Sequence, residues 1–163
     1  MNEKEYEIAY KEFLYEYRYQ DDKETQDIFE QMTDSLKEEF LNKGISRMKL
    51  EKTINELRKK YDDELKKYGF AYKESSVVYD TKEDYVYLGY SNTKETGRLA
   101  YSWLNIILYE KDNRLAIRLM AYVEGQQTNI YFNSFEDLFE KLEELSSYWN
   151  WGGFYGRWRF RYK

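Results

Sequence analysis

The sequence at residues 99–123 is LAYSWLNIILYEKDNRLAIRLMAYV, two runs of aliphatic and aromatic residues joined by a short polar stretch. Such runs are typical of strands, and the Asp-Asn pair at 112–113 favours a tight reversal of the chain. We therefore predict a hairpin with strands over 99–110 and 114–123. The consecutive apolar residues 106–108 predict that the first strand is central in its sheet and covered on both faces.

The strand signature continues on both sides of this hairpin. Runs rich in valine, isoleucine, tyrosine and phenylalanine predict further strands over 70–79, 85–90 and 127–132. Residues 157–163 alternate arginine or lysine with aromatic rings, which predicts a last strand with rings on one face and cations on the other. The sheet is therefore expected to have five or six strands.

Helical spacing characterises the first part of the chain. Apolar side chains recur there every three or four positions, which predicts three amphipathic helices. The first is expected to end near Tyr19. The second is expected to begin at the Asp-Asp pair 21–22, an N-cap signal, and to stop at the Asn-Lys-Gly stretch 42–44, because glycine tolerates the C-cap conformation. The third is expected to run from Ser46 to Gly69.

A fourth helix is predicted after the strands, because Ser134 and Asp137 have nearly the spacing of a capping box and an apolar helical stripe follows. We therefore expect an α+β fold. An N-terminal three-helix region, residues 1–69, precedes an antiparallel sheet of five or six strands with one helix packed on it, residues 70–163. The two regions are expected to form two domains or a single compact one.

The whole chain of 163 residues contains no histidine and no cysteine. Serine and cysteine nucleophiles of the triad type need an imidazole to take their proton, and zinc sites draw on histidine and cysteine, so these enzyme classes are excluded. Neither the G-x-x-x-x-G-K-[ST] phosphate loop nor the G-x-G-x-x-G dinucleotide motif occurs. We therefore expect a protein that is not an enzyme and that carries no cofactor and no metal ion.

The catalytic chemistry that remains is a magnesium site built from acidic oxygens. The Glu-Leu-Lys stretch at 64–66 matches a Glu-x-Lys nuclease motif but falls on a predicted helix rather than on a strand. Acids also cluster between residues 80 and 84, in a predicted turn where polar residues are common. An acidic-site, metal-dependent nuclease is therefore a third alternative for the function.

The C-terminal segment is the first candidate binding surface, since tryptophan and arginine dominate binding hot spots and this segment concentrates both. The candidate binding residues are Trp149, Trp151, Tyr155, Arg157, Arg159, Arg161 and Lys163. Alternating cations and rings can follow a single-stranded nucleic acid, with phosphates on the cations and bases on the rings. The same alternation also describes a half-buried strand whose rings enter the core, and both interpretations stay open.

The second candidate is an acidic patch on the predicted N-terminal helices, formed by Asp21, Asp22, Asp27, Glu30 and Asp34. A dense negative field can imitate a nucleic-acid backbone and occupy a basic groove on another protein. The alternative is an ordinary solvated helix face. Tyrosine is also abundant, with 19 residues, and Tyr85 and Tyr87 either form an outward contact surface or point into the core.

These features favour a non-catalytic protein-binding module that acts by occluding the surface of another protein, such as a nucleic-acid-binding protein or a nuclease. In size and composition the chain is similar to small proteins carried by phages and mobile elements, among them anti-CRISPR inhibitors, and that similarity implies an inhibitor of a host-defence nuclease. The alternative is a nucleic-acid-binding protein that uses the C-terminal arginine and aromatic strand.

No stretch of the chain approaches the roughly 20 apolar residues that a membrane-spanning helix needs. The first residues are charged and are followed by no apolar run of signal-peptide length. We therefore expect a cytoplasmic protein that makes no contact with a membrane.

Overall fold

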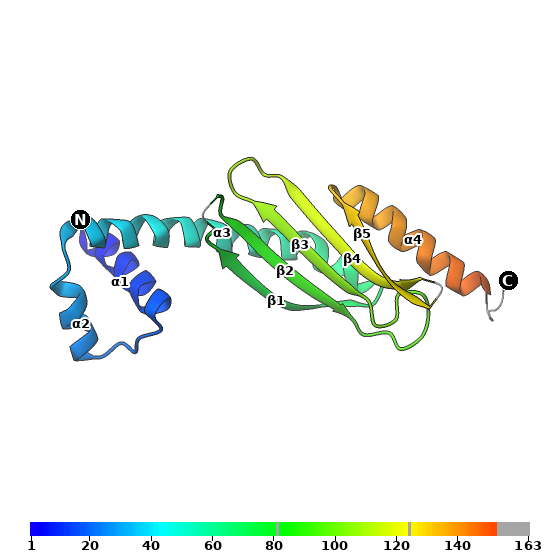
Figure 1. Cartoon of the computed structure of the whole chain (residues 1–163), viewed down its shortest axis with the longest axis horizontal. Helices are drawn as coiled ribbons and strands as arrows, with labels where there is room; N and C mark the ends of the chain where they lie inside the picture. Colours follow the sequence, from blue (N-terminus) through cyan, green and yellow to red (C-terminus); the bar gives the residue numbers. More distant parts are fainter. Residues whose placement is uncertain (81, 124, 153–163) are drawn as a thin grey trace. The chain divides into compact units, whose positions relative to one another are not determined.

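The computed structural model of the chain describes residues 1–80, 82–123 and 125–152, with side chains up to residue 146. The described residues form four helices and five strands in the order α1-α2-α3-β1-β2-β3-β4-β5-α4 (Figure 1). This is the predicted α+β class. The chain divides into two compact units, Met1–Lys52 and Thr53–Lys163, and helix α3 contributes to both.

The first unit is built from three helical segments around an aromatic core. The segments are α1 (Glu3–Tyr17), α2 (Lys23–Glu30) and the first part of α3 (Asp34–Lys66). Asn2 and Asp22 cap α1 and α2, and each accepts a hydrogen bond of 2.8 Å from a backbone N–H three residues on. The buried rings of Phe13, Phe29 and Phe40 pack against one another with centroids 5.2 to 6.3 Å apart. This ring cluster joins the three segments.

The predicted division between two helices at residues 42–44 was wrong. Soon after α2 ends, the Thr33 side chain accepts a hydrogen bond of 3.2 Å from the backbone N–H of Leu36, and α3 then runs unbroken through Gly44. A Cβ at Gly44 would lie 2.7 Å from Cγ2 of Ile8 on α1. Gly44 therefore allows two helices to approach closely and does not end a helix.

The second unit contains an antiparallel sheet in which each strand pairs with its neighbours in the sequence. The strands are β1 (Phe70–Val78), β2 (Tyr85–Asn92), β3 (Trp103–Tyr109), β4 (Leu115–Val123) and β5 (Gln126–Phe132). Their order is β1-β2-β3-β4-β5, so β3 is central, as predicted. Strands β3 and β4 confirm the predicted hairpin, and Asn113 adopts a left-handed conformation (φ 55°) in its turn. The further strand predicted at 157–163 lies outside the described residues.

The strand predicted from residue 99 begins only at Trp103. Residues before it form a turn, in which the Ser102 hydroxyl donates a hydrogen bond of 2.6 Å to the carbonyl of Leu99. Tyr101 has a φ of 59°, a left-handed conformation that a strand does not accommodate. Leu99 is nevertheless buried, at 3% exposure, so its apolar character reflects burial in a turn and not a strand.

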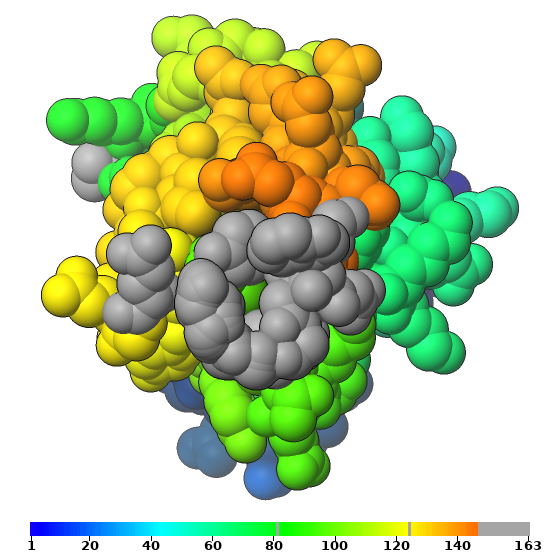
Figure 2. Space-filling view, turned by 90° about the vertical axis from the view of Figure 1, so that its right-hand side faces the viewer, coloured from blue at the N-terminus to red at the C-terminus, as the bar shows by residue number. Residues whose placement is uncertain are grey.

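One face of the sheet is covered by α4 (Phe135–Gly152) and by the second part of α3. Helix α4 lies beside β5, the strand that precedes it, in both Figure 1 and Figure 2. The ring of Tyr61 on α3 stacks on Phe135 of α4 with centroids 3.7 Å apart. The Tyr90 hydroxyl of β2 donates a hydrogen bond of 2.5 Å to Asp62 of α3. The sequence predicted one helix on this face, and α3 adds a second helical segment.

The opposite face, which we call the open face, is covered by none of the described helices. Val86, Leu88 and Ile106 point to the covered face and are at most 1% exposed. Ile107 points to the open face and is only partly buried. Among the described residues, the strand that holds residues 106–108 is central but is covered by helices on one face only, so the expected cover on both faces is not found there.

Candidate functional site

Aromatic side chains project from three neighbouring strands on the open face. Trp103 on β3, Tyr122 on β4 and Tyr131 on β5 are exposed to 38%, 48% and 69%. Their sequence neighbours Leu104 and Ala121 are buried, at 0% and 1%, as the two-residue period of a strand requires. The open face therefore presents large rings whose backbone is held in place by the buried core behind it.

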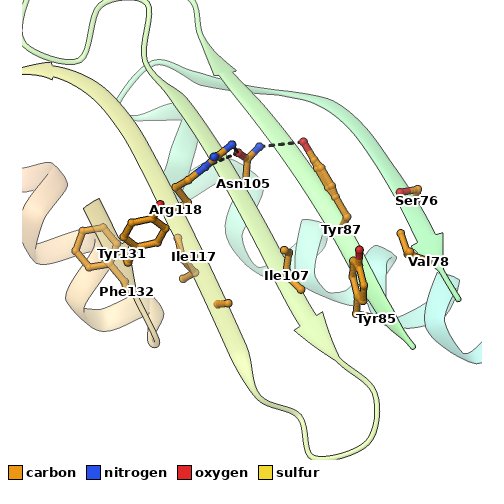
Figure 3. A pocket seen from close by; sticks show the side chains of 11 residues that line it. Ser76, Val78, Tyr85, Tyr87, Asn105, Ile107, Ile117, Arg118, Tyr131 and Phe132 are labelled. Atoms are coloured by element: carbon orange, nitrogen blue, oxygen red, sulfur yellow. Dashed lines mark hydrogen bonds between the residues drawn. The ribbon is translucent and has the colours of Figure 1, made fainter. Parts of the chain in front are cut away.

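A pocket of about 520 Å³ lies in the open face and is lined by side chains from all five strands (Figure 3). Tyr85 and Tyr87, whose direction the sequence left open, both line this pocket and are half-buried. Ile107 adds an apolar surface between them and β4. Among the described residues that line the pocket, only Arg118 is charged.

Three polar side chains form a hydrogen-bonded row across β4, β3 and β2 (Figure 3). The Arg118 guanidinium donates from Nε and Nη2 to Oδ1 of Asn105, over 3.1 and 2.5 Å. Nδ2 of Asn105 donates to the hydroxyl oxygen of Tyr87 over 2.9 Å. Asn105 and Arg118 are direct partners in the β3–β4 register, so strand pairing itself brings these groups together.

Gly89 makes room for the hydroxyl of Tyr87. Gly89 is the register partner of Asn105 on β2, and a Cβ at this position would lie 2.8 Å from the Tyr87 hydroxyl oxygen. Burial raises the pKa of Tyr87, and the negative charge of Glu74 raises it further. The hydroxyl is therefore protonated at neutral pH and can donate a hydrogen bond.

Of the pocket residues, Tyr85 and Tyr87 were considered as a contact surface from the sequence, and the others were not among the predicted binding residues. The signal available in the sequence was the pair Asn105 and Arg118, two polar side chains that interrupt the apolar strands of the hairpin. Their partnership with Tyr87 depends on the register of three strands, which the sequence pattern did not supply.

The predicted C-terminal binding residues lie at or beyond the end of the described chain. Trp149 and Trp151 belong to the last turns of α4, where only the backbone is described. Tyr155, Arg157, Arg159, Arg161 and Lys163 lie outside the described residues. Their role in binding stays a prediction.

The acidic side chains of the second candidate lie in the first unit, in and around α2. They are Asp21, Asp22, Asp27, Glu30 and Asp34. Asp22 caps α2, and Asp27 pairs with Lys23 at 2.9 Å. Asp21 accepts hydrogen bonds from Gln26 and from the Tyr10 hydroxyl, at 3.0 and 2.7 Å, and these bonds lower its pKa. Asp21, Asp22 and Asp27 therefore have structural partners within the unit, and the role of the five acids as a contact surface stays a prediction.

In the part of the chain that the structure describes, no three carboxylates gather closely enough to hold a metal ion. Likewise, no described helix has the length and apolar character that crossing a membrane requires. Comparisons with protein families, with curated proteins and with solved structures found no match to this chain.

Proposed function

We propose that the protein is a non-catalytic protein-binding module that binds its partner through the open face and occludes the surface it contacts. The observation that carries this proposal is the exposure of Trp103, Tyr122 and Tyr131 on adjacent strands of the open face. Tyr131 also lines the pocket. Tyrosine, tryptophan and arginine are enriched where proteins bind proteins, because their rings bury large areas while their polar ends keep hydrogen bonds.

The charge of the open face favours a protein partner over a nucleic acid. Arg118 lines the pocket, and Lys73 on β1 lies over the Trp103 ring with Nζ 5.5 Å from its centroid. Glu74 follows directly in β1 and offsets part of this positive charge. A groove that follows a phosphate backbone needs several cations along its length, whereas a protein interface needs few.

The position of these rings on strands also favours binding. The backbone that carries these rings is already ordered, because the alternate residues Leu104, Leu119 and Ala121 are packed in the core at 0 to 1% exposure. A partner therefore has little additional backbone entropy to remove when it docks. The prediction that the partner is a host-defence nuclease rests on composition alone and stays a prediction.

Affinity capture from cells that naturally produce the protein tests this function. We expect a partner protein to be captured by the wild-type chain and by Tyr15→Ala, but to be lost with Tyr131→Ala. Tyr15 is the matched control because it is 58% exposed, compared with 69% for Tyr131, and lies on α1. Equal capture by all three proteins would overturn the assignment to the open face. A nuclease-sensitive nucleic acid in place of a protein would favour the nucleic-acid alternative.

A further inference from the structure

Arg118 sets the direction of the hydrogen bonds that join it to Asn105 and Asn105 to Tyr87. A guanidinium can only donate hydrogen bonds, so the Asn105 side chain must turn its oxygen to Arg118 and its amide nitrogen to Tyr87. The Tyr87 oxygen then accepts a hydrogen bond, and its own proton points elsewhere. None of the described residues accepts that proton.

The row therefore presents donors to the pocket. The Arg118 guanidinium uses Nε and Nη2 toward Asn105, and its Nη1 has no partner among the described side chains. The Tyr87 hydroxyl lies at the other end of the row (Figure 3), and its proton is available to an acceptor because its oxygen accepts the bond from Asn105. Ser76 adds a further hydroxyl to the lining, and none of the described residues contributes a carboxylate to it. A ligand that satisfies these groups must bring acceptor oxygens and a negative charge.

The surroundings of the row limit the charge that the ligand carries. One guanidinium balances the single charge of a carboxylate, whereas a phosphate monoester carries close to two charges at neutral pH and usually meets several cations. Glu74 adds a negative charge near Tyr87 and so disfavours a doubly charged ligand further. Ile107 and Val78 line the same pocket and provide an apolar surface next to the donors.

We propose that this pocket takes a single Asp or Glu side chain of the partner protein, flanked by an apolar residue. The carboxylate accepts hydrogen bonds from Arg118 and Tyr87, and the apolar neighbour packs on Ile107. This inference rests on the proposed function, since it names the group by which the partner engages the open face.

The test is an NMR titration of the full chain with three capped pentapeptides, leucine-rich and identical except for a central Glu, Gln or phosphoserine. The Glu peptide is expected to shift the Arg118 Nε–H and Asn105 Nδ2 resonances with a Kd in the millimolar range. The Gln peptide is expected to bind about tenfold more weakly, because it loses the charge-assisted hydrogen bonds. The phosphoserine peptide is expected to bind no more tightly than the Glu peptide.

Two variants test whether Arg118 causes the preference for the Glu peptide over the Gln peptide. Arg118→Gln is expected to remove the preference for Glu over Gln, while Lys73→Gln, which deletes the same charge from the same sheet outside the pocket, is expected to keep it. Equal binding of the Glu and Gln peptides, or no shift at either reporter, would overturn the inference. A phosphoserine peptide that binds about tenfold more tightly than the Glu peptide would assign the pocket to phosphorylated partners instead.

Failure of this inference can be told apart from failure of the proposed function. If Tyr131→Ala abolishes capture of the partner but Arg118→Gln leaves capture unchanged, the open face binds protein without a carboxylate in this pocket. If neither substitution changes capture, the function itself is contradicted.

Discussion

The hydroxyl of Tyr90 donates a hydrogen bond of 2.5 Å to Oδ1 of Asp62, which joins the covered face of β2 to helix α3. Tyr90 is 1% exposed, so its hydroxyl depends on this acceptor within the core. Tyr90→Phe is expected to lower the free energy of unfolding by about 1 to 3 kcal/mol, because the fold loses a hydrogen bond to a charged group, the half-buried carboxylate of Asp62. Denaturant unfolding measures this change.

Tyr122→Phe is the matched control for Tyr90→Phe. Tyr122 lies on the open face, is 48% exposed and has no hydroxyl partner among the described residues. We expect its substitution to change the free energy of unfolding by less than about 0.5 kcal/mol. An equal loss of unfolding free energy in both variants would show that the hydrogen bond between Tyr90 and Asp62 does not contribute measurably to stability.

Alkaline pH is expected to destabilise the first unit through Tyr10. Burial raises the pKa of Tyr10 to about 12, and its hydrogen bond to Asp21 contributes to the shift. Because the pKa in the folded state exceeds the unfolded value of about 10, the folded state holds the proton more tightly. The resulting stability is complete below pH 10 and is lost as the pH rises toward 12.

Urea unfolding at pH 8, 10 and 11 measures this pH dependence. Tyr10→Phe is expected to reduce the decline between pH 10 and pH 11 relative to the wild type, because the variant has no hydroxyl to ionise at this position. If the two proteins decline in parallel, the hydroxyl of Tyr10 is not the titrating group.

Gly44→Ala is expected to destabilise the protein by about 1 to 3 kcal/mol, although alanine favours helix formation over glycine by about 1 kcal/mol. The reason is steric, since the added methyl group would meet Cγ2 of Ile8 at 2.7 Å. Ile8→Ala removes that carbon. The cost of Gly44→Ala should therefore be smaller in an Ile8→Ala background, and thermal unfolding of the four proteins in this double-mutant cycle measures the coupling. If the effects of Gly44→Ala and Ile8→Ala on stability were strictly additive, the close contact between the two positions would be contradicted.

Two carboxylates of α1 form ion pairs with α3 but differ in burial. Glu12, with a side chain 1% exposed, accepts a hydrogen bond of 2.7 Å from Nε of Arg47. Glu16 pairs with Lys43 at 3.2 Å with side chains 29% and 46% exposed. Glu12→Ala is expected to cost about 3 to 5 kcal/mol, because it leaves a guanidinium largely buried without this partner. Glu16→Ala is expected to cost at most about 1 kcal/mol.

Chemical unfolding of the two alanine variants measures this difference. The comparison is matched because both residues lie on α1 and both pair with a cation of α3 within the first unit. Similar losses of unfolding free energy in the two variants would contradict the idea that burial decides how much each ion pair contributes to stability.

Local periodicity predicted the strands and the class of the fold. The hairpin of β3 and β4 was predictable because its two apolar runs and its turn residues lie close together in the sequence. The unbroken course of α3 was not, because Gly44 has the appearance of a helix stop until the approach of Ile8 explains it. Contacts between distant segments override local signals of this kind.

The pocket was beyond prediction for a similar reason. Tyr87, Asn105 and Arg118 come from three strands, and only the register that pairs Asn105 with both Gly89 and Arg118 brings them together. The alternation of side chains shows which residues share a face once the register is known. The tyrosines of β2 could therefore be noticed in the sequence, but their direction could not be decided.

The most direct test of the central claim is site-specific photo-crosslinking in cells that naturally produce the protein. A photoreactive residue replaces Tyr131 on the open face or, in the matched control, Glu140, an exposed residue of α4 on the other side of the sheet. The account predicts a discrete crosslinked protein product from position 131 and none from position 140. Crosslinking to protein at position 140 alone, or to nucleic acid at position 131, would contradict it.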